Sequence, residues 1–100
     1  MLVKDDIVSF IQENRAVLKD RFSVTKNGLF GSFARGDQTP ESDIDLIVVF
    51  EENTPDLFDL KAELREYFGR RFHREVNVAR EKYLKPYARD EILSEAVYVE

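Results

Sequence analysis

The chain has 100 residues, of which 43% are hydrophobic and 35% charged, so it can build one modest core and we expect one domain over residues 1–100. It has no cysteine, no apolar run near the roughly 20 residues of a membrane helix, and no signal-peptide pattern at its start, which predicts a cytoplasmic protein outside the membrane. The net charge of −5 argues against a general nucleic-acid binder, because phosphate contacts supply most of that affinity. It suits a basic protein partner or a site that collects metal cations.

The first half of the sequence predicts a helix and two strands. Apolar residues at helical spacing predict an amphipathic helix over residues 5–20. A strand is expected at Val24–Phe30, and Gly31 should end it before a polar loop with a short helix after Ser32. Ile44–Phe50 is the clearest strand, because its continuous apolar run indicates a central strand covered on both faces.

The second half alternates in the same way. Thr54-Pro55-Asp56 predicts a helix start, since a capping hydroxyl precedes a proline and an acid, and Gly69 is the expected end. Glu75–Ala79 predicts a short alternating strand, Pro86 opens a last helix, and Val97–Val99 predicts a terminal strand. This order predicts an α/β fold (α+β in some schemes), a small sheet with helices packed on it.

Two acidic residues stand where the central strand begins. Asp43 and Asp45 are two positions apart, so their side chains should project on the same face, roughly 7 Å apart at the backbone. Their carboxylates can converge on one or two hard cations, and oxygen ligands suit Mg²⁺ or Mn²⁺.

A Gly-Ser pair follows the preceding strand. Gly31 lets the backbone approach a phosphate, and the Ser32 hydroxyl can donate a further hydrogen bond. Arg35 can pair with a phosphate or brace the loop, and the sequence leaves both roles open. The Gly-Ser loop favours a triphosphate ligand, so a small metal-dependent phosphatase or nuclease ranks last among the candidate functions.

The combined pattern resembles a known family. Ten residues separate Gly31-Ser32 from Asp43-Ile44-Asp45, which is the signature spacing of the minimal nucleotidyltransferases of the polymerase-β-like superfamily. The flanking segments are similar as well, and the resemblance covers essentially the whole chain: Leu29-Phe30, Ala34-Arg35-Gly36, Ser42–Leu46 and Ile92–Tyr98.

This resemblance implies a fold, a reaction and a partner. The fold would be the polymerase-β-like nucleotidyltransferase fold, with a small mixed β-sheet. The reaction would transfer a nucleoside monophosphate, usually AMP from ATP, with release of pyrophosphate. Gly31, Ser32 and Arg35 would then bind the triphosphate, and Asp43 and Asp45 the metal. Domains of this kind often accompany a HEPN-type toxin as its antitoxin, and some adenylylate a tyrosine on that partner.

One position departs from the family pattern. Asn77 stands where the resemblance places a third aspartate, which helps to hold the metal and accepts the proton of the attacking hydroxyl. An asparagine carries no charge and is no useful base at pH 7. Glu75 is two residues earlier on the same strand face and could substitute. The sequence therefore favours reduced or absent catalysis by a small margin, with a contact-only antitoxin as the alternative function.

The remaining features carry less weight. Arg70, Arg71, His73 and Arg74 form a basic cluster, for which a solvated helix end is favoured over a contact with phosphate or RNA. Small domains with exposed strands often pair, so homo-oligomerisation stays open.

Overall fold

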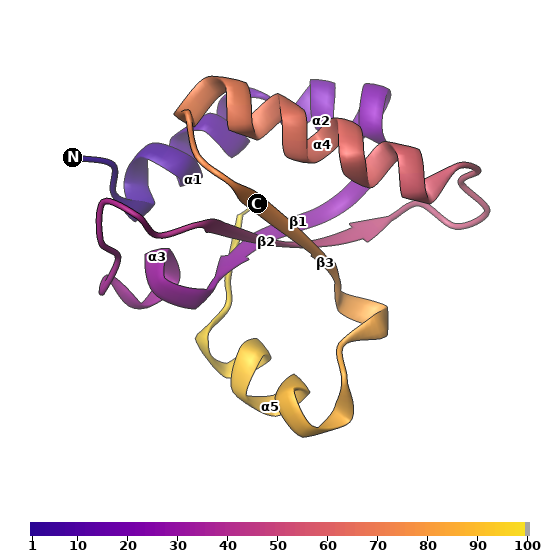
Figure 1. Cartoon of the computed structure of the whole chain (residues 1–100). Helices are drawn as coiled ribbons and strands as arrows, with labels where there is room; N and C mark the ends of the chain where they lie inside the picture. Colours follow the sequence, from indigo (N-terminus) through magenta and orange to yellow (C-terminus); the bar gives the residue numbers. More distant parts are fainter. Residues whose placement is uncertain (100) are drawn as a thin grey trace.

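Residues 1–99 are described by a computed structural model, in which a mixed β-sheet separates two layers of helices (Figure 1). Within this range the sheet has the order β3-β2-β1-β4. Its strands are β1 (Val24–Phe30), β2 (Ile44–Phe50), β3 (Val76–Arg80) and β4 (Val97–Val99). β2 runs parallel to β3, whereas β1 runs antiparallel to both β2 and β4. The predicted strands and fold class are confirmed, and β2 lies between two neighbours as its apolar run indicates.

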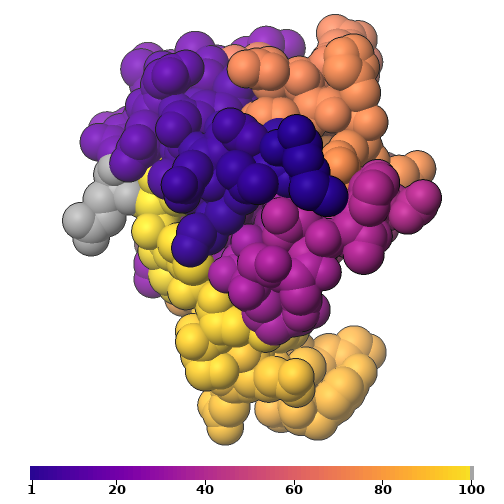
Figure 2. Space-filling view, turned by 90° about the vertical axis from the view of Figure 1, so that its left-hand side faces the viewer, coloured from indigo at the N-terminus to yellow at the C-terminus, as the bar shows by residue number. Residues whose placement is uncertain are grey.

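The two faces of the sheet are covered unequally (Figure 1). On one face lie α1 (Lys4–Glu13), α2 (Arg15–Phe22) and the long α4 (Leu57–Phe72). On the other lie the five-residue α3 (Gly31–Arg35) and the lobe made of η1 (Glu81–Tyr83) and α5 (Pro86–Glu95). In the space-filling view this lobe projects from the rest of the molecule (Figure 2). No residue of α5 is fully buried. Among residues 1–99, every helix is too short or too polar to cross a lipid bilayer.

The hydrophobic core lies mainly between β2, β1 and the helices of the first face. Burial of each large apolar side chain stabilises the fold by about 1.5–3 kcal/mol. Phe10 completes the core from α1 and packs edge-on against Phe68 and Phe72, each at 5.2 Å between ring centroids. The largest fully buried side chains include Ile7, Phe22, Leu29, Phe33, Ile44, Leu46, Ile47, Leu64 and Phe68.

The expected single helix over residues 5–20 is wrong, because the chain breaks at Asn14 into α1 and α2. Asn14 has φ −106° and ψ 17°, outside the helical range. Its side-chain amide donates to the carbonyl oxygen of Phe10 at 2.8 Å and accepts from the Tyr67 hydroxyl at 2.7 Å. Asparagine competes for backbone groups in this way, and the contact with α4 fixes the break.

Both predicted ends of α4 also need correction. The Thr54 hydroxyl donates to the Glu51 carbonyl oxygen at 2.6 Å and closes the preceding turn, so α4 begins at Leu57 rather than at Thr54. Gly69 lies inside the helix, which ends three residues later at Phe72. A Cβ atom at Gly69 would stand 3.3 Å from the Arg74 carbonyl oxygen, so this glycine allows the chain to return close to the helix.

Candidate active site

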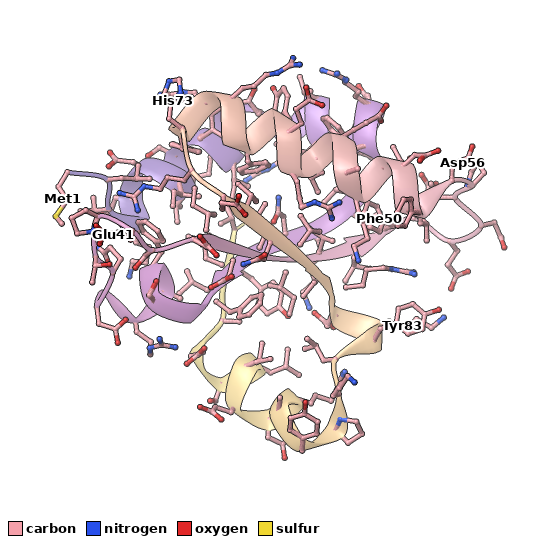
Figure 3. The ribbon with its side chains drawn as sticks, viewed as in Figure 1. Met1, Glu41, Phe50, Asp56, His73 and Tyr83 are labelled. Atoms are coloured by element: carbon pink, nitrogen blue, oxygen red, sulfur yellow. The ribbon has the colours of Figure 1, made fainter. Side chains whose placement is uncertain are left out.

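The site is built at the end of the sheet where β2 begins. In Figure 3, Glu41 marks this end of the sheet and Phe50 marks the opposite end of β2. The parallel register places Asp45 directly beside Asn77 of β3. The side-chain amide nitrogen of Asn77 donates to Asp45 Oδ1 at 2.9 Å and to Asp43 Oδ2 at 3.4 Å. The predicted convergence of the two carboxylates is therefore present, and Asn77 lies beside them.

Asp45 is the more enclosed of the two acids. Burial is the main cause that raises the pKa of the Asp45 carboxyl above its ordinary value, and the negative charges of Asp43 and Glu95 raise it further. The hydrogen bond from Asn77 and the positive charge of Arg35 act in the opposite direction. Protein groups therefore do not fully compensate the negative charges of Asp43 and Asp45, and this favours binding of a cation between the two carboxylates.

Gly31 allows the backbone to pass directly over Asp45. Phe30, the last residue of β1, pairs with Asp45 in the sheet, and Gly31 follows with φ +73°. A Cβ atom on Gly31 would stand 2.2 Å from Asp45 Oδ2. Position 31 therefore requires glycine for two reasons: its backbone is left-handed, and a Cβ atom would collide with the Asp45 carboxylate. Ser32 comes next in α3 and is partly exposed.

A carboxylate from the far end of the chain completes the loop. Glu95, the last residue of α5, accepts a hydrogen bond from the Gly31 backbone N–H at 3.2 Å. Arg35 Nη1 donates to both carboxylate oxygens of Glu95 at 3.1 Å, and Arg35 Nε donates to Asp37 at 3.1 Å. These two carboxylates raise the pKa of the Arg35 guanidinium. Of the two roles left open for Arg35, the structure shows the bracing of the loop.

Comparison with known proteins identifies the family of this chain. The sequence matches the protein family described as the nucleotidyltransferase domain over residues 11–99. The chain belongs to this family. The nucleotidyltransferase is 35% identical over 99 residues to the protein adenylyltransferase MntA of Thermococcus cleftensis, covering 99% of this chain and 98% of the relative. The predicted family membership is therefore confirmed.

Solved structures share the fold of this nucleotidyltransferase. A minimal nucleotidyltransferase superposes with a TM-score of 0.77 at 26% identity, covering 96% of this chain and 95% of the other. A chain from a toxin–antitoxin crystal structure with AMP-PNP superposes with a TM-score of 0.67 at 18% identity, covering 97% of this chain and 72% of the other. The second likeness shows the fold alone, because the identity is low.

The carboxylates of the nucleotidyltransferase fit a metal whose other ligands come from outside the protein. Asp43 and Asp45 already share one hydrogen-bond donor, the Asn77 amide, so a cation at that position could touch both. Over residues 1–99, no three or more acidic, histidine or cysteine side chains come together in a way that could hold a metal ion. Mg²⁺ commonly takes one or two carboxylates and completes its shell with water and substrate phosphates. The site therefore suits such a metal better than a pair of metals bridged by three carboxylates.

The predicted basic cluster does not act as a unit in the nucleotidyltransferase. Arg70 pairs with Glu66 one turn earlier in α4, and Arg71 lies over the Phe10 ring at 5.7 Å. Arg74 alone turns to the site loop, where its Nη1 donates to the carbonyl oxygens of Ser42 at 2.8 Å and Thr39 at 3.2 Å. The prediction missed this role, because nothing in the spacing of the four basic residues distinguishes Arg74.

Glu75 contributes its backbone to the site. Its carbonyl oxygen accepts from the Ile44 N–H at 3.0 Å and extends the pairing of β3 with β2 by one residue. The Glu75 side chain is exposed, two residues before Asn77. Substitution of the third acid by Glu75 stays a prediction. Glu95 was not predicted as a site residue, and its only signal was its place in the family-like segment Ile92–Tyr98.

Proposed function

We propose that this chain binds a nucleoside triphosphate with Mg²⁺ or Mn²⁺ and transfers AMP from ATP to a hydroxyl of a partner protein. The observation that carries the proposal is the convergence of Asp43 and Asp45 beside the glycine turn at Gly31. The two carboxylates would hold the metal, and the Gly31-Ser32 turn would bind the triphosphate through its backbone and the Ser32 hydroxyl. A bound metal would neutralise negative charge on the phosphates.

In this reaction the acceptor oxygen attacks the α-phosphorus of ATP. A new P–O bond forms to the acceptor, the bond between the α-phosphorus and its bridging oxygen breaks, and pyrophosphate leaves with the electron pair. The protein contributes mainly by positioning and by electrostatic stabilisation. The Asn77 amide accepts no proton at neutral pH, so the acceptor proton passes to water. A positioned general base typically contributes about 10²–10⁴-fold, so we expect transfer to be slower by that factor than with an aspartate at position 77.

The partner is proposed from the relatives. The Thermococcus cleftensis relative is named a protein adenylyltransferase, and related folds occur in toxin–antitoxin complexes. We infer that the acceptor is a protein toxin made in the cytoplasm together with this chain. The family resemblance makes a HEPN-type toxin with an acceptor tyrosine the first candidate.

Transfer of label from α-³²P-ATP to the toxin encoded beside this chain tests the proposal. Wild type should transfer slowly, Asn77→Asp about 10²–10⁴-fold faster, and Asp43→Ala and Asp45→Ala not at all. Asn77→Ser controls for simple loss of the amide and should not accelerate transfer. Equal transfer by wild type and both alanine variants would refute the roles of the two acids.

A second function is favoured by the Asn77 amide itself, which bridges the two acids without supplying a base. In this alternative the chain is an antitoxin that neutralises its partner by contact alone. It then predicts that Asp43→Ala and Asp45→Ala still bind the toxin and still protect cells from it. If those variants bind the toxin but no longer protect cells, contact alone is insufficient.

A further inference from the structure

Glu95 occupies the Gly31 backbone N–H, which the proposed function assigns to the triphosphate, and Arg35, which the family resemblance assigns to it. Its carboxylate accepts from the Gly31 N–H at 3.2 Å and receives both hydrogen bonds of Arg35 Nη1 at 3.1 Å. Only 19% of the Glu95 side chain is exposed, whereas 46% of the Arg35 side chain is exposed. Hydrogen bonds to an ionised acceptor are roughly twice as strong as neutral ones.

A carboxylate oxygen and a phosphate oxygen are both anionic acceptors, so they compete for the same donors. The backbone amide of Gly31 has a single hydrogen and cannot satisfy both anions with good geometry. Arg35 Nη1 is also engaged, because it donates to both carboxylate oxygens of Glu95, while Arg35 Nε donates to Asp37. A triphosphate that takes the Gly31 N–H or Arg35 Nη1 therefore has to replace Glu95 or share these donors at close range with a like charge.

The position of Glu95 excludes a different role, that of substitute for the missing third acid. Asn77 lies on β3, on one side of Asp45, whereas Glu95 reaches the site from α5 on the β1 side, where Gly31 follows Phe30. Glu95 therefore lies beside the Gly31 loop and not beside Asn77 on β3. Its negative charge still acts on the acids, since it helps to raise the pKa of Asp45.

We propose that Glu95 sets the affinity of the site for nucleoside triphosphate by occupying the Gly31 N–H and Arg35 until a phosphate group replaces it. The proposal rests on the proposed function, because it assumes that the triphosphate binds at the Gly31-Ser32 turn. Glu95 acts through the loop and is a positioning residue. Because Glu95 ends α5, binding of the triphosphate releases the contact that holds α5 to the loop.

Binding of MgATP without acceptor, measured by isothermal titration calorimetry, tests this directly. Glu95→Gln keeps the shape of the side chain but removes its negative charge, so it competes less well for the Gly31 N–H and Arg35. We expect MgATP to bind about tenfold more tightly to this variant than to wild type. A gain of this size corresponds to a rise in the fraction of molecules with free donors from about 10% to nearly all. Glu91→Gln is the matched control, since Glu91 is exposed one turn earlier in α5, and it should bind as wild type does. Equal or weaker binding by Glu95→Gln than by Glu91→Gln would overturn the proposal.

Hydrogen exchange at the Gly31 amide gives a second readout that needs no catalysis. In nucleotide-free protein the amide should exchange faster in Glu95→Gln than in wild type, and MgATP should restore protection in both. The same exchange rate in both nucleotide-free proteins would contradict the proposal even if thermal unfolding shows that both are folded. Tight MgATP binding without any transfer to a partner would refute the proposed function but leave the role of Glu95 standing. Failure of both proteins to bind MgATP would overturn both.

Discussion

Substitution of Gly31 by alanine should impair the function of the site more than the stability of the fold, and comparison with Gly36→Ala distinguishes the two effects. Gly31 and Gly36 both have positive φ, +73° and +83°, and an alanine in that region costs about 1–2 kcal/mol at either position. For a chain of this size, 1 kcal/mol lowers Tm by about 4–8 °C. The two variants differ in space, because a Cβ at Gly36 meets nothing within 4 Å, whereas a Cβ at Gly31 would stand 2.2 Å from Asp45 Oδ2.

The Asp45 carboxylate is the flexible end of a side chain, so it can move aside at little cost in stability. It must move by more than 1 Å to reach ordinary van der Waals distance from the new methyl group. A misplacement of about 1 Å at a reacting site can cost roughly 10²-fold in rate. We therefore expect Gly31→Ala and Gly36→Ala to lose similar stability, while only Gly31→Ala loses metal-dependent function.

Thermal unfolding followed by circular dichroism measures the loss of stability. Calorimetric titration with MgATP, together with the transfer assay, measures the loss of metal-dependent function. Gly36→Ala serves as the control, since it carries the same backbone strain without the contact. If Gly31→Ala bound MgATP and transferred AMP as well as Gly36→Ala, then the close approach of Gly31 to Asp45 would have no role in the site. A much larger loss of Tm in Gly31→Ala would mean that Asp45 cannot move aside.

Three further predictions follow from other contacts. Gly28→Ala would bring a methyl group 2.7 Å from a carbonyl oxygen of β4, so we expect a loss of about 1–3 kcal/mol in urea unfolding and faster amide exchange in β4; unchanged exchange would contradict this. Arg74→Met removes two hydrogen bonds to loop carbonyl oxygens and should increase proteolysis of residues 37–42, with Arg70→Met as the unaffected control. The raised pKa of Asp45 means that its contribution to stability is present below its unfolded pKa and is lost as pH rises through the folded pKa. MgATP binding should show the opposite dependence, weakening on acidification at a higher pH than an ordinary aspartate would give, whereas Asp45→Asn, which lacks a proposed metal ligand, should bind MgATP weakly at every pH.

The strands and the paired acids could be predicted because each follows from local chemistry. Leu46–Phe50 is continuously apolar and belongs to β2, the strand between β1 and β3 in the sheet. Asp43 and Asp45 share a face because strand side chains alternate. These expectations needed only the period of a strand and the order of the elements.

The helix boundaries and the partners of the charged residues could not be predicted in the same way. The break at Asn14 depends on the Tyr67 hydroxyl, 53 positions later, and the amide of Gly31 meets a carboxylate 64 positions later. Local signals also competed, since the Thr54 hydroxyl closes a turn instead of capping α4. Contacts between distant segments leave no periodic pattern in the sequence, so only the folded chain reveals them.

The lobe of η1 and α5 has a consequence for how the molecule opens. Segments with few buried apolar contacts unfold locally at a free energy below that of global unfolding. No residue of α5 is fully buried, so α5 should detach while the sheet and its three-helix layer stay folded. Each such excursion would carry Glu95 away from Gly31 and Arg35. Glu95, which holds the Gly31 loop, is thus the last residue of a helix without fully buried side chains. The lifetime of the contact between Glu95 and the loop is therefore set by how often α5 unfolds locally.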